Sequence, residues 1–98
     1  MKDPLFYIII PIYNVESYLK DCLDSVLNQS YKNFKAIMIN DGSMDYSKEI
    51  AKDYTQDDRF ILIDQENQGL SIARNTGLDY IKKALESNGG GVYSLFRF

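Results

Sequence analysis

The stretch Ile39-Asn40-Asp41-Gly42-Ser43 decides the fold, because an apolar run ends there abruptly in a carboxylate, a glycine and a hydroxyl. Residues 34–39, just before it, have the composition of a buried strand. An earlier apolar run, residues 6–12, is rich in β-branched side chains and is followed directly by Tyr13. A helical pattern separates the two runs. The sequence therefore predicts two adjacent parallel strands joined by a right-handed helical crossover.

Parallel strands place Tyr13 and Asp41 at the same carboxyl-terminal edge of the sheet, where open α/β sheets bind their ligands. An aromatic face beside a carboxylate suits a heterocycle that stacks and donates a hydrogen bond, such as a nucleotide base. Each residue also has a structural interpretation. Tyr13 can pack at a strand end, and Asp41 can cap the turn that follows it.

The first predicted helix shows apolar residues at the i, i+3, i+4 spacing of one helical face. Asn14 is the expected N-cap, and Glu16 lies in the first turn, where the helix dipole favours an anion. We assign the whole stripe to the core. It comprises Val15, Tyr18, Leu19, Cys22, Leu23, Val26 and Leu27.

The same alternation continues with a helix over residues 46–54, capped by Ser43 or Asp45, and a strand over residues 60–63. A third helix begins at residue 70 or 71. Its expected inner face, with tyrosines 54 and 80 assigned to the core as well, comprises Ala73, Gly77, Tyr80, Ile81, Ala84 and Leu85. Residues 92–98 read as a fourth strand. We predict an α/β fold, a Rossmann-like half with a parallel sheet of order 3-2-1-4 flanked by helices.

Composition narrows the possible functions. The 98 residues form one small domain or part of a larger one, and the net charge of −3 argues against nucleic acid as a partner. The chain has no histidine and one cysteine, Cys22, which excludes Ser-His-Asp and Cys-His catalysis and an imidazole zinc site within these residues. No membrane-spanning run and no signal peptide are evident. We expect a cytoplasmic protein, with any attachment to the inner face of the membrane made through regions outside this chain.

Four blocks in order resemble successive motifs of the family 2 glycosyltransferases, which have the GT-A fold. The blocks are residues 8–14 (IIIPIYN), 23–31 (LDSVLNQSY), 40–45 (NDGSMD) and 69–77 (GLSIARNTG). The resemblance implies an inverting transfer of a sugar from a nucleoside diphosphate sugar, typically UDP-linked, to a saccharide or lipid-linked acceptor in polysaccharide or cell-surface glycan synthesis. Residues 1–98 would then be the N-terminal, nucleotide-binding part of such an enzyme, with the acceptor-binding part absent.

The resemblance also implies roles for individual residues. Tyr13 would stack on the base, Asp41 would accept a hydrogen bond from uracil, and Arg74 would reach the base edge or the phosphates. The full nucleotide-binding set that it implies is Pro11, Tyr13, Glu16, Asp41, Asn67, Gly69 and Arg74, with Asn75 supporting Arg74. Two of these positions have other interpretations: Glu16 as a helix-dipole partner, and Arg74 paired with Asp41 or Glu66. Asp45, outside this set, is interpreted as a helix cap rather than a site residue.

Family members carry an Asp-x-Asp after the fourth strand that holds Mn²⁺ or Mg²⁺ against the diphosphate. Alignment places this motif at or just beyond Phe98, so we expect the full-length enzyme to use the metal and this chain to lack its ligands and the catalytic base. A longer insertion before the motif is the alternative. Asp57-Asp58 precedes the third strand, at the opposite edge of the sheet.

Two other functions stay open at this point: a binding-only remnant that holds nucleotide or an assembly partner without turnover, and a receiver-like module with Asp41 as phosphoacceptor. The fourth strand has no covering helix after it. We therefore expect the fragment to self-associate, or to order its tail around Gly89-Gly90-Gly91 poorly, which light scattering would test.

Overall fold

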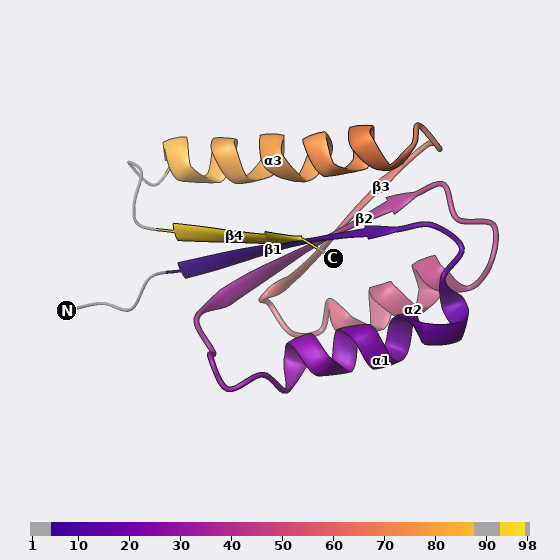
Figure 1. Ribbon diagram of the computed structural model, residues 1–98, viewed down its shortest axis with the longest axis horizontal. Coiled ribbons are helices and arrows are strands. Elements are labelled where there is room, and N and C mark those ends of the chain that lie inside the picture. Colours follow the sequence, from indigo (N-terminus) through magenta and orange to yellow (C-terminus); the bar gives the residue numbers. More distant parts are fainter. Residues whose placement is uncertain (1–4, 88–92, 98) are drawn as a thin grey trace.

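Strands and helices alternate along the chain in the computed structural model, which describes residues 5–87 and 93–97 (Figure 1). The elements are β1 (Leu5–Ile12), α1 (Glu16–Leu27), β2 (Phe34–Asp41), α2 (Ser47–Tyr54), β3 (Phe60–Gln65), α3 (Leu70–Ser87) and β4 (Tyr93–Arg97). None of the helices in this part of the chain combines the length and apolar character that crossing a bilayer requires.

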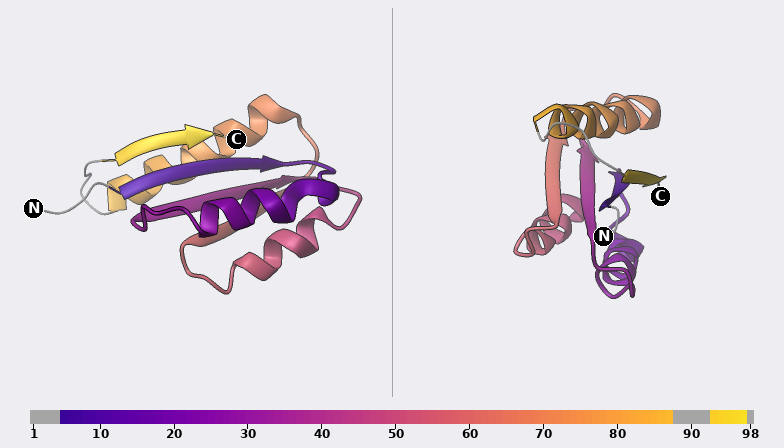
Figure 2. Two further views of the ribbon diagram at one scale, coloured as in Figure 1. Left: turned by 60° about the horizontal axis from the view of Figure 1, so that its bottom comes forward. Right: turned by 90° about the vertical axis from the view of Figure 1, so that its left-hand side faces the viewer.

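The strands form one parallel sheet in the order β3-β2-β1-β4 (Figures 1 and 2). The α3 helix covers one face of the sheet, and α1 and α2 cover the other (Figure 2). The predicted α/β fold and the order 3-2-1 of the first three strands are confirmed. The expected glycine tract at 89–91 and the two ends of the expected fourth strand lie outside the described residues, and the expected self-association stays a prediction.

The sheet separates two apolar clusters. Side chains of alternate strand residues, such as Ile8 and Ile10, pack toward α1 and α2, whereas Ile9 and Ile39 pack toward α3. Such burial on both faces is typical of parallel sheets enclosed by helices. It explains why the strands appear in the sequence as continuous apolar runs.

The predicted core stripe of α1 is only partly correct. Leu19, Leu23 and Val26 are buried, but 63% of Tyr18 is exposed, so its assignment to the core is wrong. Tyr18 lies on the flank of the apolar stripe, where its ring reaches solvent. Cys22 is half-buried, and burial raises the pKa of its thiol. Tyr54 and Tyr80 pack at the margins of the two clusters, as expected.

The α3 helix approaches the sheet closely at Gly77. A Cβ placed on Gly77 would lie 2.9 Å from Cγ2 of Ile9 and 3.1 Å from Cδ1 of Ile39. Ala73 and Ile81 are buried on the same helix face. The prediction that small residues bring this helix against the sheet is confirmed.

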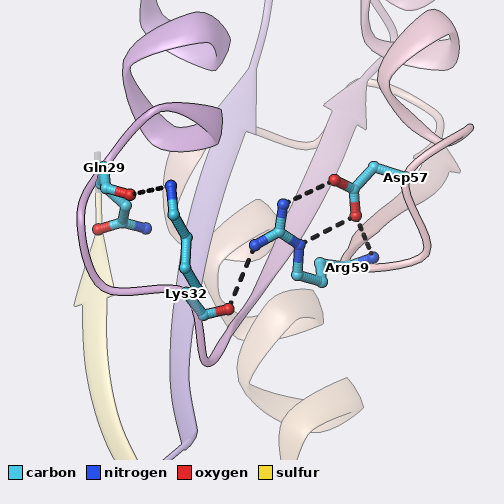
Figure 3. Close-up of polar contacts among 4 residues, drawn as sticks. All are labelled: Gln29, Lys32, Asp57 and Arg59. Atoms are coloured by element: carbon cyan, nitrogen blue, oxygen red, sulfur yellow. Dashed lines mark hydrogen bonds and ion pairs between the residues drawn. The ribbon is translucent and has the colours of Figure 1, made fainter.

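At the amino-terminal edge of the sheet, Arg59 joins two connections (Figure 3). Its guanidinium contacts the Asp57 carboxylate twice, at 3.0 and 2.7 Å, and donates to the carbonyl of Lys32 at 3.2 Å. The Lys32 ammonium in turn donates to the carbonyl of Gln29. Asp57 thus closes the turn before β3, at the edge opposite Asp41.

The ion pair predicts a pH-dependent stability. Hydrogen bonds from Arg59 lower the pKa of Asp57 to about 2, whereas an unfolded aspartate titrates near about 3.9. Because the folded pKa is lower, the contribution is complete above the unfolded value and is lost as the pH falls toward 2. We expect Asp57→Asn to lower the free energy of unfolding at pH 6 by about 1 kcal/mol.

Urea unfolding at pH 6 and near pH 2 tests this. The difference between wild type and Asp57→Asn should shrink at the lower pH, whereas the exposed neighbour Asp58→Asn should change stability by less than about 0.5 kcal/mol at either pH. A difference for Asp57→Asn that is the same at both pH values would contradict the assigned ion pair.

Candidate functional site

Two loops interlock at the carboxyl-terminal edge of the sheet, where β1 and β2 end. Asn14, which has a positive φ of 50°, donates its backbone N–H to Ser43 Oγ at 3.1 Å. Its side-chain Oδ1 accepts the N–H of Met44 at 2.7 Å. The prediction that Asn14 caps α1 is therefore wrong. Its side chain is bonded to the next loop instead.

The N-terminus of α1 is capped by residues that lie about thirty positions later in the sequence. Ser47 Oγ accepts the N–H of Val15 at 2.9 Å, and Asp45 Oδ2 accepts the N–H of Glu16 at 3.1 Å. The other oxygen of Asp45 accepts the N–H of Ser47, the first residue of α2. The N-cap position of α2 is Tyr46, so the prediction of Ser43 or Asp45 at that position is wrong. Burial opposes the charge of Asp45, but hydrogen bonds from Ser47 and Glu16 lower its pKa.

Asp41, at the end of β2, is the most heavily bonded side chain of this edge. Only 4% of its surface is exposed. Oδ1 accepts Gln65 Nε2 and the N–H of Gln68, both at 2.9 Å. Oδ2 accepts the N–H of Gly69 at 2.9 Å and Asn67 Nδ2 at 3.4 Å. The carboxylate thus organises the whole β3–α3 loop. The interpretation that Asp41 caps the turn directly after it is wrong, because in that turn the N–H of Ser43 is bonded to Asn40 Oδ1 instead.

These bonds keep Asp41 ionised. Burial raises its pKa, but the hydrogen bonds from Gln65, Gln68 and Gly69 together outweigh burial and lower it. Gly42 beside it has a φ of 70°, and a Cβ there would lie 2.7 Å from the N of Asn67. Glycine at this position therefore lets the two loops approach each other, and the backbone freedom expected of Gly42 is confirmed.

A cavity of about 410 Å³ opens beside Asp41. It is lined by Pro11, Ile12, Tyr13, Val15, Asp41, Asn67, Gly69, Leu70 and Ala73. The Tyr13 side chain is 47% exposed. The predicted convergence of Tyr13 and Asp41 at one edge is confirmed, together with that of Pro11, Asn67 and Gly69.

Glu16 and Arg74 do not line this cavity. Glu16 is exposed in the first turn of α1. Arg74 lies half-buried on α3, and its buried Nε has no hydrogen-bond partner among the described residues. The alternative in which Arg74 pairs with Asp41 or Glu66 is not seen among the described residues: none of the ion pairs there includes Arg74, and Asp41 is bonded to uncharged donors of the β3–α3 loop.

Sequence reasoning missed Gln65 and Thr76, which lie behind Asp41. Gln65 is the register partner of Asp41 on the neighbouring strand, and Thr76 Oγ1 lies 2.7 Å from Gln65 Oε1. The sequence offered one signal for Gln65: it is a polar residue at the end of the strand next to the one that bears Asp41.

The metal expected for a full-length enzyme stays a prediction. No group of three or more cysteine, aspartate or glutamate side chains converges there in a way that would hold a metal ion. The position expected for the Asp-x-Asp, at or beyond Phe98, lies outside the residues that the structure describes.

Comparison with known proteins identifies the family. The glycosyl transferase family 2 profile matches residues 7–84. The chain belongs to this family. Family 2 membership excludes the receiver-like alternative and agrees with a cavity at the carboxyl-terminal edge of the sheet.

The relatives are longer than this chain. Glycosyltransferase GlyA of Streptococcus pneumoniae is 53% identical to the family 2 chain over 80 residues, which cover 81% of this chain and 12% of that protein. Staphylococcus aureus TarS, solved with UDP-GlcNAc, is 26% identical with a TM-score of 0.71, over 76% of this chain and 23% of the TarS chain. The matched part is thus less than a quarter of either protein.

A third similarity, to a solved structure of low sequence identity, supports the fold and nothing more. The mannosyltransferase PcManGT of Pyrobaculum calidifontis, solved with GDP-Man and Mn²⁺, is 21% identical with a TM-score of 0.73. The match covers 81% of this chain and 25% of that one. The GT-A fold of the family 2 chain is therefore shared with glycosyltransferases of very different sequence.

Proposed function

We propose that this chain is the nucleotide-binding part of an inverting glycosyltransferase that uses a nucleoside diphosphate sugar, with UDP as the carrier. The observation that carries the proposal is the cavity that Tyr13 and Asp41 line together. A half-exposed ring offers a stacking face, and an ionised carboxylate offers an acceptor. Uracil has both a flat face and an N–H donor. TarS, which binds UDP-GlcNAc in its solved structure, supports this choice of carrier.

The base N–H needs an acceptor position on Asp41. A carboxylate offers about four such positions, and the loop already occupies two on each oxygen. The weakest contact is that of Asn67, 3.4 Å from Oδ2, whose amide also donates to the Asp41 carbonyl at 3.0 Å. The base replaces this long contact, and Asn67 keeps its bond to the carbonyl.

The rest of the activity belongs to the longer protein. Arg74, with an unpartnered Nε, is the candidate to reach the nucleotide after a side-chain rotation, and Glu16 stays a prediction. The cation, the catalytic base and the saccharide or lipid-linked acceptor require residues beyond those described. The 98 residues alone are expected to bind nucleotide and to transfer no sugar.

Titration of the chain with uridine or UDP, followed by NMR, tests the proposal. We expect a dissociation constant in the millimolar range, about −4 kcal/mol, with little dependence on Mn²⁺. Shifts should cluster at Tyr13 and Asp41. Because stacking contributes about 1–3 kcal/mol per base, Tyr13→Ala should weaken binding about tenfold or more.

Tyr18→Ala is the matched control, because Tyr18 is also an exposed tyrosine but does not line the cavity. It should leave the affinity unchanged. Tight, metal-dependent binding, or shifts that avoid the cavity, would overturn the proposal.

A further inference from the structure

A line of hydrogen bonds runs from α3 through β3 to Asp41. Thr76 Oγ1 lies 2.7 Å from Gln65 Oε1, and Gln65 Nε2 lies 2.9 Å from Asp41 Oδ1. Gln65 ends β3 and is the register partner of Asp41 on β2. Neither Gln65 nor Thr76 lines the cavity that Asp41 faces.

The chemistry of the three side chains fixes which group donates and which accepts in each of these hydrogen bonds. An ionised Asp41 only accepts hydrogen bonds, so the NH₂ of Gln65 must face it and the amide oxygen must face Thr76. The Thr76 hydroxyl has one proton, and its oxygen also lies 3.0 Å from the carbonyl of Ile72. Both the Gln65 oxygen and the Ile72 carbonyl can only accept, and the shorter distance, 2.7 Å, directs that proton to Gln65. Thr76 therefore fixes the amide, and the amide fixes Oδ1 of Asp41.

We infer that Gln65 and Thr76 are positioning residues for nucleotide recognition: they hold Oδ1 of Asp41 from behind, so that Oδ2 is presented to the base. This inference rests on the proposed function, in which the base donates to Asp41. The backbone N–H groups of Gln68 and Gly69 belong to the loop between β3 and α3. Gln65, by contrast, is anchored in the sheet, and Thr76 in a helix packed on that sheet.

The role of Thr76 in positioning Asp41 can be tested separately from the stability of the fold. The packing of α3 at this point depends on Ala73 and Gly77, which contact the sheet, whereas Thr76 is only half-buried. Thr76→Val keeps the shape of the side chain and removes the proton donor. The fold should survive this change, and the orientation of the Gln65 amide should not.

Two measurements test the positioning role of Gln65 and Thr76. The first is the pKa of the Asp41 carboxyl in the ligand-free chain, measured by ¹³C NMR. Thr76→Val and Gln65→Leu should raise it, because each weakens or removes a hydrogen bond to the charged form. The charged residues nearest along the flanking elements are Asp64, Glu66 and Arg74. None of them bonds to the Asp41 carboxylate, and all are present in every variant.

The second readout is the dissociation constant for uridine, which we expect to rise about fivefold to tenfold in both variants. Thr76→Ser keeps the hydroxyl and should restore both readouts to wild-type values. Thr55→Val is the matched control, since the Thr55 hydroxyl bonds the carbonyl of Lys52 on α2, far from Asp41 along the chain. It should change neither readout.

The outcomes distinguish this inference from the proposed function. If the wild-type chain binds no uridine, the proposed function fails, and the pKa readout still decides whether the pair holds Asp41. If wild type binds but Thr76→Val and Gln65→Leu retain its affinity and its Asp41 pKa, the positioning role is wrong. It is equally wrong if Thr76→Ser behaves like Thr76→Val.

Discussion

Asp41→Ala is expected to lower the free energy of unfolding by about 3 kcal/mol and to abolish uridine binding. The substitution removes the acceptor for Gln65 and for the N–H groups of Gln68 and Gly69. A buried donor left without a partner costs about 1–3 kcal/mol. Gln68 and Gly69 are exposed, so their N–H groups can bond to water instead. The expected total is therefore near the lower limit, about 1 kcal/mol for each of the three donors. Urea unfolding and NMR titration measure the two losses.

Asp64→Ala is the matched control for this prediction. Asp64 lies one strand away and also bears a carboxylate, bonded to Lys48 and Asn40. Its side chain is 48% exposed, but its removal also leaves Nδ2 of the buried Asn40 without its acceptor. It should therefore cost about 1 kcal/mol, well below the loss for Asp41→Ala, and leave uridine binding intact. An Asp41→Ala chain as stable as Asp64→Ala would show that the loop does not depend on Asp41.

Gly77→Val is expected to lower the free energy of unfolding by about 3 kcal/mol, because it overpacks the contact between α3 and the sheet. A single Cβ at this position already comes within 2.9 Å of Ile9. Valine adds two further methyl groups between α3 and the sheet. The helix therefore has to move away from β1 and β2, which separates the apolar cluster on that face. Thermal unfolding followed by circular dichroism measures the loss.

Lys83→Val on the same helix is the control, because Lys83 is exposed and valine there bears only its small helix-propensity cost of less than about 1 kcal/mol. Gly77→Ala should fall between the control and Gly77→Val. Equal stability of Gly77→Val and Lys83→Val would refute the close contact between α3 and the sheet.

The sheet order of the first three strands followed from the alternation of apolar runs and helical stripes, because connection handedness leaves few topologies. The same reasoning brought Tyr13 and Asp41 together. The bonds behind Asp41 did not follow from it. They depend on the strand register that pairs Gln65 with Asp41 and on the rotation of α3 about its axis, which directs Thr76 toward Gln65. No local sequence pattern encodes either of these.

The prediction that Asn14 caps α1 failed for a similar reason. Asn14 has the right chemistry for an N-cap, but its positive φ of 50° takes it out of the β-region conformation that a capping residue uses. The residues that do the capping come from the loop after β2 (Asp45) and from the first position of α2 (Ser47). Local sequence identifies a candidate cap and not a cap supplied across the fold.

The cap on α1 has an electrostatic consequence. In dinucleotide-binding folds, the N-terminus of the first helix, with a partial charge of about +0.5, receives the pyrophosphate. Here the N–H groups of Val15 and Glu16 are bonded to the chain's own side chains, and one of these is the carboxylate of Asp45. A diphosphate arriving there would meet a negative charge in place of free donors. This fold therefore has the topology of a phosphate-binding half, but the N–H groups of Val15 and Glu16 at its first helix are already occupied by the chain's own side chains.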